Sequence, residues 1–257
     1  MINKWHSMIE VQTESQKVYS GTQVLLDAEE GLAKYNRDVV KKIASGLGIN
    51  VSEKRGGAAI SIVEFGAGTG ALAEVWRELF DIEPLCVEID PSLIKILQIK
   101  GFKTVNDIQD IASKTSLIYT SNVLEHIQDD VKALKRIREN MEPGGKVAVY
   151  VPAVPILFSD LDRKVGHYRR YRKHELIHKV KLAGFEIENC YFNDSVGVIA
   201  SLVLRVVGYK NKAGLGSKRS LLFYDSFIYP ISKVLDRLFF SRLIGKNLFL
   251  FATNPKI

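Results

Sequence analysis

The residues best suited to hold a ligand are three alternating glycines, Gly66, Gly68 and Gly70, in the stretch VEFGAGTGAL at residues 63–72. A β-branched run precedes them and helically spaced apolar residues follow, so the sequence predicts a strand, a turn and a helix. Glycine adopts a positive φ without steric cost, and the N–H groups that begin such a helix attract an anionic group. With Ala71 in last place, the turn fits both GxGxG and the dinucleotide pattern GxGxxA, so it leaves the identity of the ligand open.

A carboxylate at the end of the next predicted strand would complete a nucleoside site. Glu88 ends that strand in CVEID, about twenty residues after the turn, where a carboxylate can accept hydrogen bonds from both ribose hydroxyls. Asp90 lies two positions on and precedes Pro91, a pattern that predicts a helix cap. Nicotinamide and adenosyl cofactors both carry this ribose, so Glu88 does not separate them.

A basic segment further along the chain carries groups that bind anions. Residues 163–181 hold eight Lys or Arg and a single acid. Within GHYRRY, Arg169 and Arg170 could each bind a phosphate or carboxylate through two hydrogen bonds, while Tyr168 and Tyr171 could stack or donate. Two interpretations stay open, a segment that covers the substrate and a basic surface with aromatic anchors.

The elements that must position these residues alternate between strand and helix patterns. The predicted strands are nearly continuous apolar runs, which is typical of a parallel sheet covered on both faces. We expect an α/β fold with a doubly wound, Rossmann-like, seven-stranded and mostly parallel sheet. A helical N-terminal cap is expected at 1–57, and the main domain at 58–257, with substrate-cap insertions at about 153–175 and 195–243.

The composition is that of a globular chain. Its apolar fraction of 46% and charged fraction of 25% argue against wholesale disorder. The longest apolar run, VGVIASLVL, stops at Arg205, so neither an export signal nor a membrane span is expected. Cys86 and Cys190 lack any paired or metal-ligand spacing, which favours reduced cysteines and a cytoplasmic protein. The aromatic runs LLFYDSFIYP and RLFF are interpreted first as helical core, with a lipid-facing groove as the alternative.

Five motifs in order make residues 60–152 resemble the class I S-adenosylmethionine-dependent methyltransferases: EFGAGTG, VEIDP, VNDI, SNVLEHI and PGGKVAVYVP. The resemblance implies S-adenosylmethionine as cofactor and S-adenosylhomocysteine as product. It disfavours a nicotinamide dehydrogenase, in which SNVLEH and PGG have no role. The residues it assigns to the cofactor are Glu64, Gly66, Ala67, Gly68 and Gly70 in the methionine-side loop, Glu88 and Ile89 at the ribose, Asp107 and Ile108 at the adenine, and Asn122 and Val123 at the end of the fourth strand.

Further segments resemble a bacterial methyltransferase group whose members look like small-molecule or saccharide enzymes. They are YNR at residues 35–37, LDRKVGHYRRYRKHEL and AGFEI. The expected reaction is O-methylation of a polar or anionic small molecule or sugar conjugate, and the basic segment at residues 163–181 argues for an anionic acceptor. Methylation of RNA or protein, and cofactor binding without turnover, are kept as alternatives. A nucleic-acid partner is the less favoured, because SNVLEH stands where base methylation would place an Asn-Pro-Pro-aromatic motif.

Methyl transfer to a hydroxyl benefits from a general base, and histidines near the fourth strand are the candidates. His126 follows that strand closely and His167 lies in GHYRRY. No cluster of carboxylates and histidines has metal-ligand spacing, so no metal is expected. Peripheral membrane contact and the oligomeric state are left open. The residues expected to contact the acceptor are Tyr19, Tyr35, Asn36, Tyr168, Arg169, Arg170, Tyr171 and Asn193.

Overall fold

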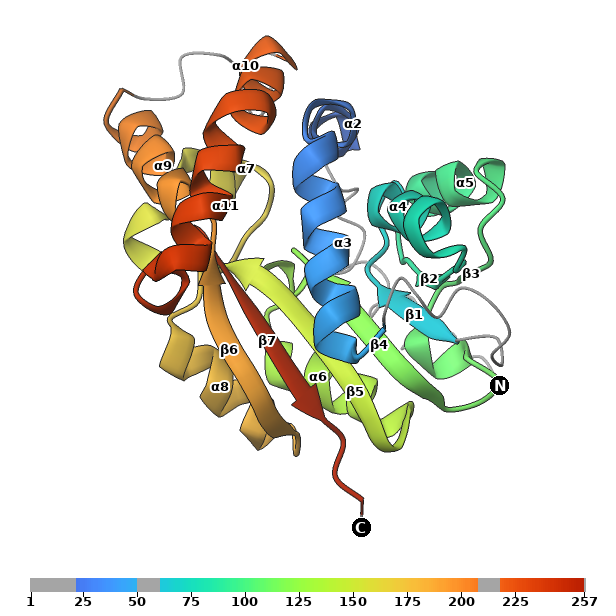
Figure 1. The fold of residues 1–257 in the computed structure, drawn as a ribbon. Helices are drawn as coiled ribbons and strands as arrows, with labels where there is room; N and C mark the ends of the chain where they lie inside the picture. Colours follow the sequence, from blue (N-terminus) through green and yellow to red (C-terminus); the bar gives the residue numbers. More distant parts are fainter. Residues whose placement is uncertain (1–21, 50–60, 208–217, 257) are drawn as a thin grey trace, which may run out of the picture.

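A seven-stranded sheet forms the centre of the protein in the order β3-β2-β1-β4-β5-β7-β6 (Figure 1). The computed structural model describes residues 22–49, 61–207 and 218–256, so Tyr19 lies outside the described residues. β7 is antiparallel to both of its neighbours and the other pairs are parallel, which confirms the predicted doubly wound α/β sheet. The strands are β1 Ile62–Phe65, β2 Leu85–Val87, β3 Thr104–Val105, β4 Thr115–Ser121, β5 Met141–Pro152, β6 Glu186–Asn193 and β7 Asn247–Thr253.

Helices cover both faces of this sheet (Figure 1). The helices are α2 Thr22–Gly31, α3 Ala33–Leu47, α4 Ala71–Phe80, α5 Pro91–Ile99, α6 Asp130–Glu139, α7 Asp160–Lys164, α8 Lys173–Leu182, α9 Ser195–Val207, α10 Lys218–Phe223 and α11 Tyr229–Leu238. Single 3₁₀ turns are η2 Ile108–Asp110, η3 Leu124–His126, η4 Pro155–Leu157 and η6 Phe240–Arg242, and η5 Tyr224–Ile228 is a π-helical turn.

The two faces of the sheet have separate cores because side chains alternate along each strand. In β5, Val147 and Val149 belong to the core under α6 and α8, whereas Ala148 and Tyr150 belong to the core under α3 and α4. All four side chains are at most 1% exposed. A strand buried on both faces is therefore an unbroken apolar run, as the sequence predicted.

The N-terminal helices reach the edge of the sheet where β1, β2 and β4 end. The chain breaks between α2 and α3 at Leu32. Leu25 of α2 lies over the glycine turn, since its Cδ1 is 3.4 Å from the place a Cβ would take on Gly68. Lys100 pairs with Glu29 of α2 across 2.5 Å and ties this helix to the main domain.

One long helix, residues 218–238, is made of α10, η5 and α11. Phe223, Phe227, Phe239 and Phe240 in and just after it are exposed. The interpretation of these aromatic runs as helical core is therefore wrong for these four residues, because a different face of the helix packs inward. Within the described ranges, no helix combines the length and the apolar character needed to cross a bilayer.

Candidate active site

The glycine turn between β1 and α4 has the backbone shape that the sequence predicted. Gly66, Gly68 and Gly70 have φ values of 78°, 58° and 82°. A Cβ on Gly66 would lie 2.3 Å from a methyl group of Val123, which follows β4. Ala67 between the glycines is buried. The turn therefore lies directly against the end of β4, and only glycine fits at its closest point.

Glu88 joins the end of β2 to this turn. One carboxylate oxygen accepts the N–H of Gly68 at 2.8 Å, and the other accepts the N–H groups of Ile89 and Asp90 at 2.8 and 3.0 Å. Burial raises the pKa of Glu88 above its ordinary value, although these three donors oppose the shift. Ile89 is 75% exposed, so an apolar surface lies beside the carboxylate. Asp90 accepts the N–H groups of Ser92 and Leu93, which confirms it as the cap of α5.

Glu64 in β1 lies beneath the turn and is only 3% exposed. Burial raises the pKa of its carboxyl to about 8, and the charge of Glu88 contributes to the shift. Its Oε2 has no hydrogen-bond partner among the described residues. A buried oxygen without a hydrogen bond is destabilising, so a ligand that supplies a hydrogen-bond donor or a positive charge to it would be bound more tightly.

Asp107 and Ile108 lie at the end of β3, where the adenine side of the site is expected. Asp107 caps η2 by accepting a hydrogen bond from the N–H of Gln109 at 3.0 Å. Its other carboxylate oxygen accepts a hydrogen bond from Arg136 Nη2 at 2.7 Å. Ile108 is 1% exposed. A contact from Asp107 to a purine would therefore use lone pairs that these two partners leave available.

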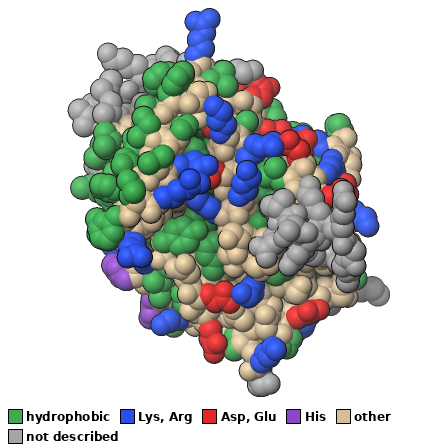
Figure 2. All heavy atoms as spheres, in the orientation of Figure 1, with side chains coloured by type: hydrophobic (Ala, Val, Ile, Leu, Met, Phe, Trp, Pro, Cys, Tyr) green, Lys and Arg blue, Asp and Glu red, His purple; other side chains and the backbone are tan. Residues whose placement is uncertain are grey.

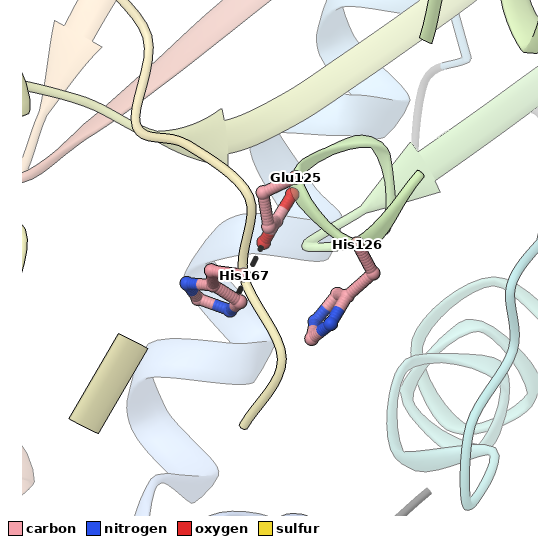
Figure 3. A group of neighbouring side chains, drawn as sticks. All are labelled: Glu125, His126 and His167. Atoms are coloured by element: carbon pink, nitrogen blue, oxygen red, sulfur yellow. Dashed lines mark ion pairs between the residues drawn. The ribbon is translucent and has the colours of Figure 1, made fainter. Parts of the chain in front are cut away.

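The chain leaves β4 through Asn122, which is exposed and has a φ of 53°. The turn η3 that follows brings Glu125 and His126 to the end of the strand, where His167 joins them (Figure 3). His167 Nε2 lies 3.9 Å from Glu125 Oε1, and the two imidazole rings meet edge to face at 4.5 Å. The backbone N–H of Tyr168 donates to the Glu125 carbonyl at 2.8 Å, which fastens the two segments together.

Because their ligand atoms lie within 4.8 Å of one another, Glu125, His126 and His167 could hold a divalent cation. The sequence shows no metal-ligand spacing, but the fold brings these three residues together. The third ligand comes from a segment 41 residues further along the chain, so no local spacing reveals the group.

The protonation of this cluster is set by burial. Burial raises the pKa of Glu125 to about 8 against the positive charge of Arg170. It also lowers the pKa of His126 to about 4, with the charge of His167 contributing. Both oxygens of Glu125 are fully buried without a hydrogen-bond partner among the described residues. At pH 7 the cluster thus contains a Glu125 carboxyl that is mostly protonated beside a His126 imidazole that is neutral.

Asp162 in α7 fixes the orientation of His167. Its Oδ1 lies 2.8 Å from His167 Nδ1, which leaves Nε2 turned toward Glu125. Arg170 holds the same carboxylate through Nε at 2.9 Å and Nη2 at 3.0 Å. Although burial opposes it, His167 and Arg170 hold the pKa of Asp162 well below its ordinary value. A carboxylate behind a histidine is the arrangement that orients both catalytic and metal-bound imidazoles.

Three other residues of GHYRRY, namely Arg169, Arg170 and Tyr171, make hydrogen bonds within the protein. Arg169 donates to the carbonyls of Ile127 and Gln128 and pairs with Asp130 at 2.7 Å. Tyr171 is fully buried and its hydroxyl donates to the same aspartate at 2.8 Å. Of the four residues expected to bind the acceptor here, only Tyr168 is exposed, at 57%. The arginines and Tyr171 therefore anchor the segment to the end of β4.

Tyr35 and Asn193 belong to a polar chain between α3, β5 and β6. The hydroxyls of Tyr35 and Tyr150 are 2.5 Å apart, and Asn193 Nδ2 donates to the latter at 2.9 Å. Burial raises the pKa of Tyr35 far above its ordinary value. Asn36 is half-buried on α3. Tyr35 and Asn193 thus have internal partners, so any acceptor contact from them would share hydrogen bonds already made.

Sequence reasoning missed the role of Glu125 and Asp162. Glu125 was visible within SNVLEH, but nothing in its neighbourhood distinguishes it from a surface acid. Asp162 precedes His167 by five residues and Arg170 by eight. The chain turns at Gly166, which has a φ of 85°, and both side chains contact Asp162 in the folded protein.

A protein family described as "Methyltransferase domain" matches residues 30–189. Trans-aconitate 2-methyltransferase of Deinococcus radiodurans is 28% identical over 98 residues, which are 36% of this chain and 38% of that protein. The match therefore spans well under half the length of that curated relative.

Solved structures share the fold at low sequence identity. A putative sarcosine dimethylglycine methyltransferase from Galdieria sulphuraria aligns with a TM-score of 0.55 and 13% identity, over 86% of this chain and 87% of that one. A SAM-dependent methyltransferase from Archaeoglobus fulgidus aligns with a TM-score of 0.52 and 15% identity, over 76% of this chain and 86% of that one. At these identities the comparison establishes a Rossmann-like methyltransferase fold and nothing finer.

Proposed function

This chain belongs to the methyltransferase-domain family, and from that premise we propose that it transfers the methyl group of S-adenosylmethionine to a hydroxyl oxygen of a polar, anionic small molecule or sugar conjugate. The observation that carries the proposal is the cluster of Glu125, His126 and His167, which closely follows Val123, the residue that packs against the glycine turn. Burial raises the pKa of the Glu125 carboxyl in this cluster to about 8. A general base of this strength suits a hydroxyl acceptor.

The residues at the ends of β1, β2 and β4 fit S-adenosylmethionine. In the turn, the N–H groups of Gly66 and Ala67 donate to the Val87 carbonyl and that of Gly68 donates to Glu88, so the methionine carboxylate would use the N–H groups of the first turn of α4. Glu88 would hold the ribose hydroxyls, and the unpartnered oxygen of Glu64 suits the methionine ammonium. When bound, the cofactor supplies an electrophilic methyl group on a sulfonium sulfur.

The chain's own residues would align the acceptor and remove its proton. Glu125 would take the proton of the acceptor hydroxyl as its oxygen accepts the methyl group, and S-adenosylhomocysteine would be the other product. His167, oriented by Asp162, would donate or accept a hydrogen bond at the same oxygen through Nε2. A divalent cation held by Glu125, His126 and His167 would instead acidify the hydroxyl directly.

Net charge and cysteine burial support the acceptor class and the location that we propose. The net charge of +7 favours an anionic acceptor, and the curated relative is named for a small molecule, trans-aconitate. Cys86 and Cys190 are free and buried, in keeping with a cytoplasmic location.

We propose the division into an N-terminal cap at 1–57 and a main domain at 58–257. No feature of the site favours methylation of RNA or protein, or cofactor binding without turnover.

An acceptor panel tests the proposal. Purified protein and methyl-labelled S-adenosylmethionine are incubated with pairs of compounds that differ in one group: hydroxyl or its methyl ether, phosphorylated or neutral. We expect label only on free hydroxyls, with kcat/KM at least about 10-fold higher for the anionic member of a pair. Transfer to amines in preference to hydroxyls, or to RNA in preference to any small molecule, would contradict the proposal.

A further inference from the structure

The helix formed by α10, η5 and α11 exposes a row of apolar side chains along one face. Five of them recur at intervals of three or four residues and are between 54% and 72% exposed. They form one stripe along the helix, which we name the apolar ridge: Phe223, Phe227, Ile231, Val234 and Leu238. Figure 2 shows hydrophobic side chains gathered over α9 and α11 on this face.

The inward face of the same helix is mostly polar. Asp225 accepts the N–H groups of Lys34 and Tyr35 at 2.9 and 2.8 Å. Asp236 accepts the N–H groups of Asp194 and Ser195 at 2.8 and 3.1 Å. These bonds fix which face of the helix turns inward, so the ridge is held at the surface. A helix in water normally has the opposite arrangement, with its apolar stripe facing the core.

The exposed apolar surface continues beyond the ridge. α11 packs against both α9 and η6, and these neighbours add more exposed apolar side chains. They are Ile199, Leu202, Phe239, Phe240, Leu243 and Ile244, each between 39% and 63% exposed. A continuous apolar surface of this extent marks a contact with another molecule or with a membrane.

A basic groove runs along the side of the ridge. A cavity of about 390 Å³ lies between α3 and α11, and its lining includes one acid, Asp38. Among the described residues, no ion pair involves three of its cations, Lys34, Lys41 and Arg237. Val234 lines the groove and also belongs to the ridge. The remaining cations of the lining are Arg37, paired with Glu78, and Lys233, paired with Asp38.

We propose that the apolar ridge and the basic groove dock onto a bilayer surface that contains anionic phospholipids. Apolar side chains on one flank of a helix enter the boundary between headgroups and acyl chains, while cations on the next flank meet lipid phosphates. A second copy of the chain suits this surface less well. A twofold contact would bring the groove's five cations close to the same five cations of the partner.

Binding of the protein to vesicles tests this proposal independently of the proposed methyl transfer. The full chain is sedimented with vesicles of phosphatidylcholine alone or with about 30% phosphatidylglycerol. We expect at least about 10-fold tighter binding to the anionic vesicles, lost at high salt. The double variant Phe227→Ser with Ile231→Ser should bind at least about 10-fold more weakly. Lys41→Glu with Arg237→Glu should remove the preference for anionic vesicles.

Matched controls carry the same substitutions on other faces. Ile99→Ser with Leu182→Ser changes two exposed apolar residues of α5 and α8. Lys95→Glu with Lys135→Glu reverses two exposed charges of α5 and α6. Both controls should bind vesicles within about twofold of wild type, and circular dichroism should show all variants folded.

Three results would overturn the proposal. Equal binding of both vesicle types by the wild type would show that the basic groove does not bind anionic headgroups. Tight binding of inorganic phosphate in calorimetry without vesicle binding would make the groove a site for a free anion. A dimer in light scattering that Phe227→Ser with Ile231→Ser dissociates, again without vesicle binding, would make the ridge an interface between copies.

Discussion

Replacing Glu125 by Gln is expected to lower kcat for methyl transfer by about 100-fold or more, because a positioned general base contributes about 10²–10⁴-fold. The amide keeps the shape of the side chain but cannot accept the hydroxyl proton. The dissociation constant for S-adenosylhomocysteine should stay within about twofold, since Glu125 lies at the acceptor side of the proposed site. Initial rates and calorimetry on the same preparation check both values.

The control for this variant is Glu142→Gln, which removes an exposed carboxylate at the start of β5. It should leave kcat unchanged. Loss of cofactor affinity in Glu125→Gln equal to its loss of rate would show that the carboxyl shapes the cofactor pocket and is not the base.

The pH dependence of the same variant follows from the raised pKa. The base is the ionised form, so wild-type kcat should rise with pH and level off above about 8, where the Glu125 pKa lies. The folded state favours the protonated carboxyl. Wild-type stability should therefore fall as pH rises from the ordinary glutamate range through about 8. Glu125→Gln should melt at a higher temperature than wild type above that pH and gain nothing at pH 5. Parallel melting curves for the two proteins would contradict the assignment.

Replacing Glu88 by Ala is expected to raise the dissociation constant for S-adenosylmethionine by about 30-fold or more, because hydrogen bonds to a charged group contribute about 1.5–3 kcal/mol each. The substitution removes the proposed ribose contacts and also frees the N–H of Gly68 from its partner. Calorimetric titration measures the affinity.

The matched control is Glu83→Ala, a change to an exposed carboxylate just before β2. It should bind the cofactor as wild type does. Unchanged affinity in Glu88→Ala, with the protein still folded, would show that the ribose lies elsewhere.

The sequence predicted the features that depend on local pattern. The glycine turn and the cap at Asp90 each follow from backbone preferences of a few neighbouring residues. The sheet follows from the alternation of apolar strands and amphipathic helices. These features need no knowledge of which distant residues meet.

The sequence could not predict the partners of charged residues. Arg169 and Arg170 have the chemistry of anion-binding side chains, but Asp130 and Asp162 neutralise them after folding. For the same reason the sequence could not predict the cluster of Glu125 with His167, whose two segments meet only in the folded chain. Helical periodicity also favoured burial of the apolar ridge. In the structure, hydrogen bonds to Asp225 and Asp236 place the opposite face of the helix inward.

We expect the ends of β1, β2 and β4 to hold S-adenosylmethionine with its methyl group directed at Glu125 and His167. A crystal structure of the complex with S-adenosylhomocysteine tests it most directly. We expect the ribose hydroxyls to donate to Glu88, the methionine end to lie against the turn at Gly66 to Gly70, and the sulfur to face the Glu125 side chain. A cofactor bound with its sulfur turned away from Glu125, or bound outside the glycine turn, would contradict it.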